Sequence, residues 1–199
     1  MKKFLETAFV DVRSSARTDV LHESIVESLC EVNPKFAEYD WEYEVSIPDG
    51  YSLPEENPRQ KKFKIDIVGK KDGKIKICVL AKAMQSCIGK NMQNYTNTTI
   101  GESCRILYSP IASDIEKVLF VSFYPREAPV FTRDGSVRGI ENVYLNKPKV
   151  DHILSGQFGG KVLAVDCPYD IVDLNQKRNI EDFQKIDIEN LDLNSMIVA

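Results

Sequence analysis

Residues 63–82, FKIDIVGKKDGKIKICVLAK, constrain the fold of this chain more than any other stretch. Apolar and polar residues alternate on both sides of the tetrapeptide Lys-Asp-Gly-Lys at 71–74, and such alternation is typical of half-buried strands. Asp-Gly favours the left-handed backbone of a short hairpin turn. The stretch therefore predicts an antiparallel β-hairpin.

The charged residues of the predicted hairpin include Asp66 in its first strand and Lys82 at the end of its second. Side chains in a strand alternate between the two faces of the sheet. This alternation predicts that Asp66, Leu80 and Lys82 share one side of the sheet. The apolar residues of the first strand are expected on the other side, and they are Phe63, Ile65 and Ile67.

The remaining elements follow from similar patterns. An apolar stripe of Leu21, Ile25 and Leu29 predicts a helix over 18–32. The stretch 86–109 is polar and rich in asparagine, and it is expected to become helical only from Gly101 onward. The other expected elements are a half-buried strand at 39–47, buried strands at 117–124 and 161–169, a short helix ending at Gly156, and a long loop over 126–148.

This order predicts an α/β fold with a central mixed β-sheet flanked by helices, in the order αβββαβ. A chain of 199 residues favours one domain over 1–199, with a C-terminal extension of helix and loop over 170–199.

The composition limits the function classes. The net charge of −4 argues against a protein that coats nucleic acid non-specifically. No window approaches the roughly 18 apolar residues of a membrane span. The five cysteines include no CxxC pair, which favours free thiols over a zinc site or disulfides. Acids interrupt the N-terminal stretch, which argues against a secretory signal, so we expect a cytoplasmic protein.

With Asp66 on one strand and Lys82 at the end of the next, the chain resembles the PD-(D/E)xK phosphodiesterases, a superfamily that includes most type II restriction endonucleases. The resemblance covers about residues 18–168 and implies a restriction-endonuclease-like core. In that family the first acid holds Mg²⁺ beside the scissile phosphate, and the lysine orients the attacking water. The resemblance therefore implies that Asp66 is a metal ligand and that Lys82 is catalytic.

Leu80 departs from the family pattern, which has an acid at this position as a second metal ligand. One interpretation is that the acid has moved to the following helix, where Glu102 is the first candidate and Gln85 a weaker one. A second is that the chain is an inactivated nuclease, and a third is that it belongs to another fold family. Among the other acids, one of Asp40, Glu42 and Glu44 could point into the site, whereas Glu23 and Glu27 are expected in solvent.

The segment after the lysine strand often enters the DNA major groove in restriction enzymes, and here it is rich in amide, hydroxyl and basic side chains. Such side chains make specific contacts to base edges. By resemblance, the expected base-reading residues are Lys90, Asn91, Asn94, Asn97, Thr98 and Arg105. Basic residues at 58–64 and 126–138 are candidates for phosphate contacts.

The sequence thus predicts a type II restriction endonuclease that cuts double-stranded DNA with Mg²⁺, using Asp66, Lys82 and Glu102. Such enzymes usually act as homodimers, because two-fold protein symmetry matches palindromic sites. The alternative is a catalytically inactive DNA-binding or scaffold protein with the same fold, and a third hypothesis is an unrelated α/β protein that binds another protein.

Overall fold

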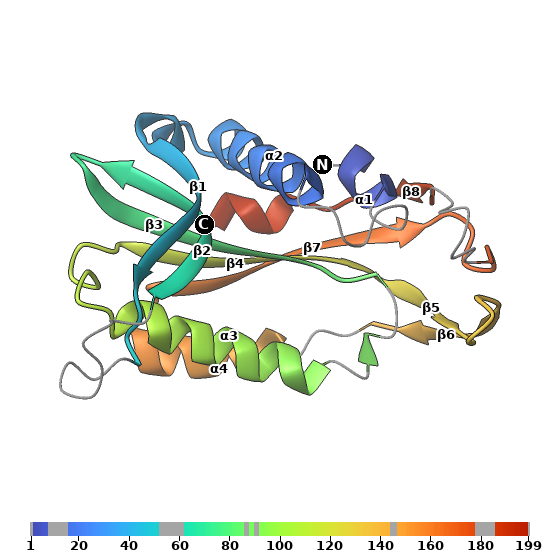
Figure 1. Cartoon of the computed structure of the whole chain (residues 1–199). Helices are drawn as coiled ribbons and strands as arrows, with labels where there is room; N and C mark the ends of the chain where they lie inside the picture. Colours follow the sequence, from blue (N-terminus) through green and yellow to red (C-terminus); the bar gives the residue numbers. More distant parts are fainter. Residues whose placement is uncertain are drawn as a thin grey trace.

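The computed structural model describes residues 2–7, 16–51, 62–85, 88–89, 92–143, 147–177 and 186–198. In this part of the chain a mixed sheet of six strands has the order β1-β2-β3-β4-β7-β8 (Figure 1). The strands are β1 (Asp40–Pro48), β2 (Lys62–Lys71), β3 (Lys74–Ala83), β4 (Lys117–Pro125), β7 (Val162–Ile171) and β8 (Ile188–Glu189). The predicted α/β fold with a mixed central sheet is confirmed.

The sheet is mixed because its connections differ. Strands β1, β2 and β3 form an antiparallel meander. Helices α3 (Met92–Leu107) and α4 (Lys147–Phe158) precede β4 and β7, and these crossovers make the β3–β4 and β4–β7 pairs parallel. Beginning at α2 (Ala16–Val32), the order of helix, three strands, helix and strand is therefore the predicted one.

Helices cover both faces of the sheet (Figure 1). Helices α1 (Lys2–Thr7) and α2 lie on one face, together with the 3₁₀ helix η3 (Asn194–Val198). The second 3₁₀ helix, η1 (Pro34–Glu38), joins α2 to β1. Helices α3 and α4 lie on the opposite face, so each face has its own apolar core.

The turn between β2 and β3 is the predicted one. Asp72 and Gly73 both have positive φ angles, 53° and 71°, as a type I′ hairpin turn requires. Gly73 takes this backbone without cost, and aspartate tolerates it better than most residues. The Asp-Gly pair therefore fixes the register of the hairpin that carries Asp66 and Lys82.

Three elements differ from the prediction. The expected loop over 126–148 contains a second hairpin, β5 (Glu127–Phe131) and β6 (Val137–Asn142), whose turn is closed by hydrogen bonds from Thr132 and Ser136 to Asp134. Helix α4 continues past Gly156 to Phe158, because a glycine in a helix interior is tolerated at modest cost. Helix α3 begins at Met92 rather than near Gly101, so most of the asparagine-rich segment is helical.

The C-terminal residues also differ from the expected extension of helix and loop. Strand β8 pairs with β7 at the edge of the sheet, and Met196 of η3 is fully buried in the core on the α2 face. A two-residue strand is too short to produce an alternation pattern, so β8 could not be predicted from local patterning. In the described part of the chain, no helix is long and apolar enough to cross a membrane.

Candidate functional site

Asp66 lies where the β2–β3 hairpin stops pairing in the regular way. The backbone pairing of these strands runs from Ile67–Val79 to the turn at Lys71–Lys74. One residue further from the turn, Oδ2 of Asp66 accepts a hydrogen bond of 2.8 Å from the backbone N–H of Ala81. A side-chain carboxylate thus takes the place that a backbone carbonyl would fill in a continued ladder. This bond fixes the orientation of the Asp66 carboxylate.

At the same position, the apolar side chains of β2 change from one face of the sheet to the other. Ile67 packs in the core on the α2 face, whereas Phe63 and Ile65 pack in the core on the α3–α4 face. The expectation that all three share one face is therefore wrong. Strand β1 switches as well, since the register pairs Tyr43 with Ile67 and Val45 with Ile65 but skips the residues between them.

The residue that β1 places at this switch is Glu44, with a left-handed φ of 57°. A non-glycine residue rarely takes this backbone, and it costs of order 1–3 kcal/mol. Because Glu44 stands between Tyr43 and Val45, and Asp66 between Ile65 and Ile67, both acids occupy the skipped positions of paired strands. The irregularity therefore brings two carboxylates to one point of the sheet.

Lys82 and Glu102 meet on the α3 side of this point. Nζ of Lys82 lies 3.5 Å from Oε2 of Glu102, and the two side chains are 28% and 22% exposed. Burial raises the pKa of Glu102, the charge of Lys82 opposes that shift, and the negative charge of Asp66 adds to it. The structure therefore places Lys82 beside Glu102, and Asp66 is near enough for its charge to act on Glu102.

Leu80 does not face this group of charges as a ligand would. It is only 4% exposed and packs in the core on the α3–α4 face, near Ile106 and Leu154. Gln85, the weaker candidate for a replacement ligand, donates to the backbone carbonyl of Leu5 in α1. Of the two candidates, only Glu102 lies beside Lys82.

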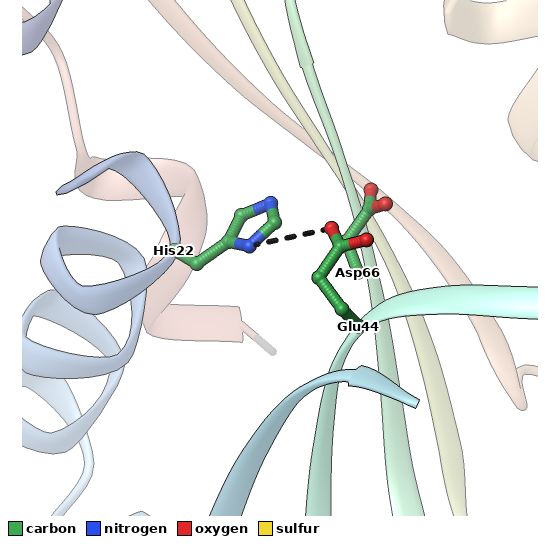
Figure 2. Close-up of side chains that lie close together, drawn as sticks. All are labelled: His22, Glu44 and Asp66. Carbon is green, nitrogen blue, oxygen red and sulfur yellow. Dashed lines mark ion pairs between the residues drawn. The ribbon is translucent and has the colours of Figure 1, made fainter. Parts of the chain in front are cut away.

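A second group of ligand atoms lies on the α2 side (Figure 2). One ligand atom each from His22, Glu44 and Asp66 lies within 4.8 Å of the other two. Nδ1 of His22 is 3.9 Å from Oε1 of Glu44. Figure 2 shows the imidazole extending from α2 toward the Glu44 carboxylate, with Asp66 beside it. The group therefore joins a helix to two strands.

His22 was not among the residues predicted to form the site, and Glu44 was one of three acids of β1 that could point into it. A signal for His22 was present, because it lies next to Leu21 and three residues before Ile25, on the apolar stripe of α2. A polar residue on a buried face needs a partner. Nothing in the alternation of β1 distinguishes Glu44 from Glu42, since the left-handed backbone has no sequence signature here. Glu23 and Glu27 are exposed, as predicted.

Asp66 belongs to both groups, and its surroundings favour a bound cation. Burial raises the pKa of Asp66, and the charge of Glu44 raises it further. This pKa is lowered in turn by the hydrogen bond from the Ala81 N–H and by the charges of His22 and Lys82. Glu44 pairs with Lys64, and Glu102 pairs with Lys82. A hard cation prefers carboxylate oxygens, and among the described residues the side chains close enough to share one ion are His22, Glu44 and Asp66.

The expected base-reading residues fall into three groups. Asn94 and Asn97 are exposed on α3, and Thr98 is half-buried there. Lys90 and Asn91 lie outside the described residues. Arg105 already has internal partners, because it forms an ion pair of 2.6 Å with the buried Asp49 and stacks over Phe63 at 4.3 Å. These contacts hold α3 against the end of β1.

Comparisons with known proteins add no relative. No protein-family model matches the chain, and neither the curated proteins nor the solved structures include a match.

Proposed function

We propose that this protein is an endonuclease that hydrolyses phosphodiester bonds of double-stranded DNA with Mg²⁺, as a type II restriction enzyme of a restriction-modification system does. The observation that carries the proposal is the pairing of Lys82 with Glu102 at 3.5 Å, next to Ala81, whose N–H donates to the carboxylate of Asp66 where β2 and β3 stop pairing. An acid pair beside a lysine is the residue set that metal-assisted phosphodiester hydrolysis needs.

In this proposal Asp66 and Glu102 hold the ion, and Glu102 supplies the acid that the family pattern has at the position of Leu80. The coupling of their charges supports this assignment, since Asp66 raises the pKa of Glu102. When bound, Mg²⁺ lowers the pKa of its water and neutralises charge on the phosphate oxygens. The Ala81 N–H keeps the Asp66 carboxylate in place for this role.

Lys82 has two roles in the proposal. Its ammonium group orients the attacking water, and its charge stabilises the negative charge that develops on the phosphate. The 3.5 Å contact with Glu102 holds Nζ in place and keeps it from pairing elsewhere. The side chain is 28% exposed, so a substrate phosphate has access to it.

The DNA-facing surface in this proposal is the exposed side of α3. Asn94 and Asn97 lie on the same helix as Glu102, so base contacts and catalysis would be carried by one rigid element. A homodimer would present two such helices to a palindromic site. We also propose that the protein acts in the cytoplasm.

A cleavage assay tests the proposal directly. The chain is incubated with phage DNA and Mg²⁺ or Mn²⁺, beside Asp66→Ala and a matched control, Asp72→Asn, at the exposed hairpin turn. Discrete fragments from the wild type and from Asp72→Asn, with a loss of at least ~100-fold in Asp66→Ala, are expected for an essential catalytic group. Equal cleavage by Asp66→Ala would remove Asp66 from the mechanism.

The inactive DNA-binding protein remains the second candidate, and the burial of Leu80 favours it. If the wild type does not cut, DNA binding is titrated at increasing salt, because a protein that neutralises phosphates loses affinity steeply as salt rises. Cutting by Leu80→Glu alone would identify an inactivated nuclease. Its folding is checked in parallel, since a buried carboxylate destabilises a core.

A further inference from the structure

The group on the α2 side contains an imidazole atom that the fold leaves without a hydrogen bond. His22 is only 2% exposed, and its Nδ1 has no hydrogen-bond partner among the residues that the structure describes. Leaving a buried polar atom unpaired costs of order 1–3 kcal/mol. Such an atom, directed at two carboxylates, indicates a ligand that completes the arrangement (Figure 2).

We propose that His22, Glu44 and Asp66 form a binding site for a divalent transition-metal ion such as Mn²⁺ or Zn²⁺. This inference does not require the nuclease activity, and it adds two ligands that the Mg²⁺ site of the proposed function does not use. The site consists of one imidazole nitrogen from α2 and two carboxylates from paired positions of β1 and β2.

The geometry suits an ion of this kind after a small adjustment. The ligand atoms lie within 4.8 Å of one another, and Nδ1 of His22 is 3.9 Å from Oε1 of Glu44. Metal–ligand bonds of about 2.1 Å place neighbouring ligand atoms about 3–4 Å apart. Closing the group therefore takes shifts of about 1 Å in carboxylate side chains, and the side chain of Glu44 is 36% exposed.

The donor set distinguishes this site from one for Mg²⁺ or Ca²⁺. Those ions take oxygen ligands almost exclusively, whereas an imidazole beside carboxylates suits zinc, iron and manganese. Three protein ligands leave further coordination positions open for water or substrate. The bond from the Ala81 N–H to Oδ2 of Asp66 is an outer contact of the kind that fixes a ligating carboxylate.

The left-handed backbone of Glu44 fits this role. With ordinary alternation, Glu44 would follow Tyr43 onto the opposite face, away from α2. Tyr43 stacks on His22 with ring centroids 6.1 Å apart, and Glu44 nonetheless reaches the same imidazole. Backbone strain of this kind is typical of functional sites. The strained backbone therefore brings the Glu44 carboxylate to the His22 imidazole.

Direct metal binding tests the proposal without reference to DNA. Free Mn²⁺ is measured by electron paramagnetic resonance as it is titrated with the wild type, His22→Gln, Glu44→Gln and the control Glu42→Gln. Glu42 is two residues away on the same strand and pairs with Lys70. We expect one saturable Mn²⁺ site in the wild type and in Glu42→Gln. Losing a ligand should weaken binding by ~10-fold or more, the lower end of the range for outer contacts.

Spectroscopy of the bound ion identifies the nitrogen ligand. Pulsed measurements on bound Mn²⁺ should show ¹⁴N coupling in the wild type and none in His22→Gln. The half-exposed Glu44 provides a second variant whose folding does not depend on a buried substitution. Absence of saturable Mn²⁺ and Zn²⁺ binding, or wild-type affinity in both ligand variants, overturns the proposal.

Glu102→Gln separates this inference from the proposed function. If that variant loses Mn²⁺ while His22→Gln and Glu44→Gln retain it, the ion is held on the α3 side, and this inference is wrong although the nuclease stands. If Mn²⁺ binds at His22 and DNA is not cut, the nuclease proposal fails and the metal site stands.

Discussion

The two ends of the β2–β3 hairpin differ in how their strands are held together and in the side chains that they carry. From Ile67–Val79 to the turn, the strands pair through their backbones with one register shift between Gly69 and Lys70, and the apolar side chains of Ile67, Ile77 and Val79 pack in the core on the α2 face. At the other end, the carboxylate of Asp66 substitutes for a backbone acceptor, and four more ionisable groups gather around it. The same two strands thus provide both a stable frame and a strained, charged site. Natural proteins concentrate such departures at functional positions.

The strongest test of this comparison is a substitution toward the turn. Ile77→Ala removes a fully buried side chain and should lower the free energy of unfolding by about 2–5 kcal/mol. Chemical denaturation gives this value, and Mn²⁺ affinity measured well below the transition should change little. A large loss of metal affinity in folded Ile77→Ala would mean that the two ends are not separate.

Asp66→Asn at the charged end should have the reverse effect. The amide oxygen still accepts from the Ala81 N–H, and the cost of a buried charge is removed, so stability should be unchanged or higher. Cleavage should fall by at least ~100-fold, because an amide is a poor substitute for a metal-binding carboxylate. Unfolding curves and initial cleavage rates check the two parts, and a destabilised variant would show that Asp66 serves the fold.

Glu102→Gln tests the charged end through the pH dependence of the free energy of unfolding, measured in EDTA. Burial raises the pKa of Glu102 in the folded state, so the folded chain binds its proton more tightly than the unfolded chain. The contribution of Glu102 to stability should therefore be greatest below its unfolded pKa and be lost as pH rises through its folded pKa. Glu102→Gln should show less of this decline, while Glu116→Gln, at an exposed ion pair, should follow the wild type.

The smallest expected effect concerns Lys64, which pairs with Glu44 from an exposed position. A bound ion has to compete with this ammonium group for the carboxylate. Lys64→Gln should therefore tighten Mn²⁺ binding by a few-fold, the size of one exposed charge pair of about 0.2–1 kcal/mol. The Mn²⁺ titration measures it, with Lys62→Gln on the same strand as the control. Weaker binding in Lys64→Gln would mean that Lys64 positions Glu44.

The sequence predicted the frame better than the site, for a physical reason. Hairpins and helices repeat a local pattern, so Asp72-Gly73 and the stripe of α2 could be located from the chain alone. The family resemblance named Glu102 as a candidate for the missing acid, and the structure places it 3.5 Å from Lys82. Glu44 could not be found, because a switch of faces depends on how β1 and β2 fit across the sheet. Local alternation contains no information about that fit.

The position of Asp66 couples ionisable groups on the two faces of the sheet electrostatically. Most of the buried side chains on the two faces of the sheet are apolar, and they separate one set of helices from the other. Asp66 feels the charges of His22 and Glu44 on one side and of Lys82 on the other, and its own charge acts on Glu102. A cation that neutralises Asp66 from the α2 side would therefore ease the ionisation of Glu102 across the sheet. By linkage, protonation of Glu102 would weaken binding of that cation by the same free energy by which the cation favours ionisation of Glu102.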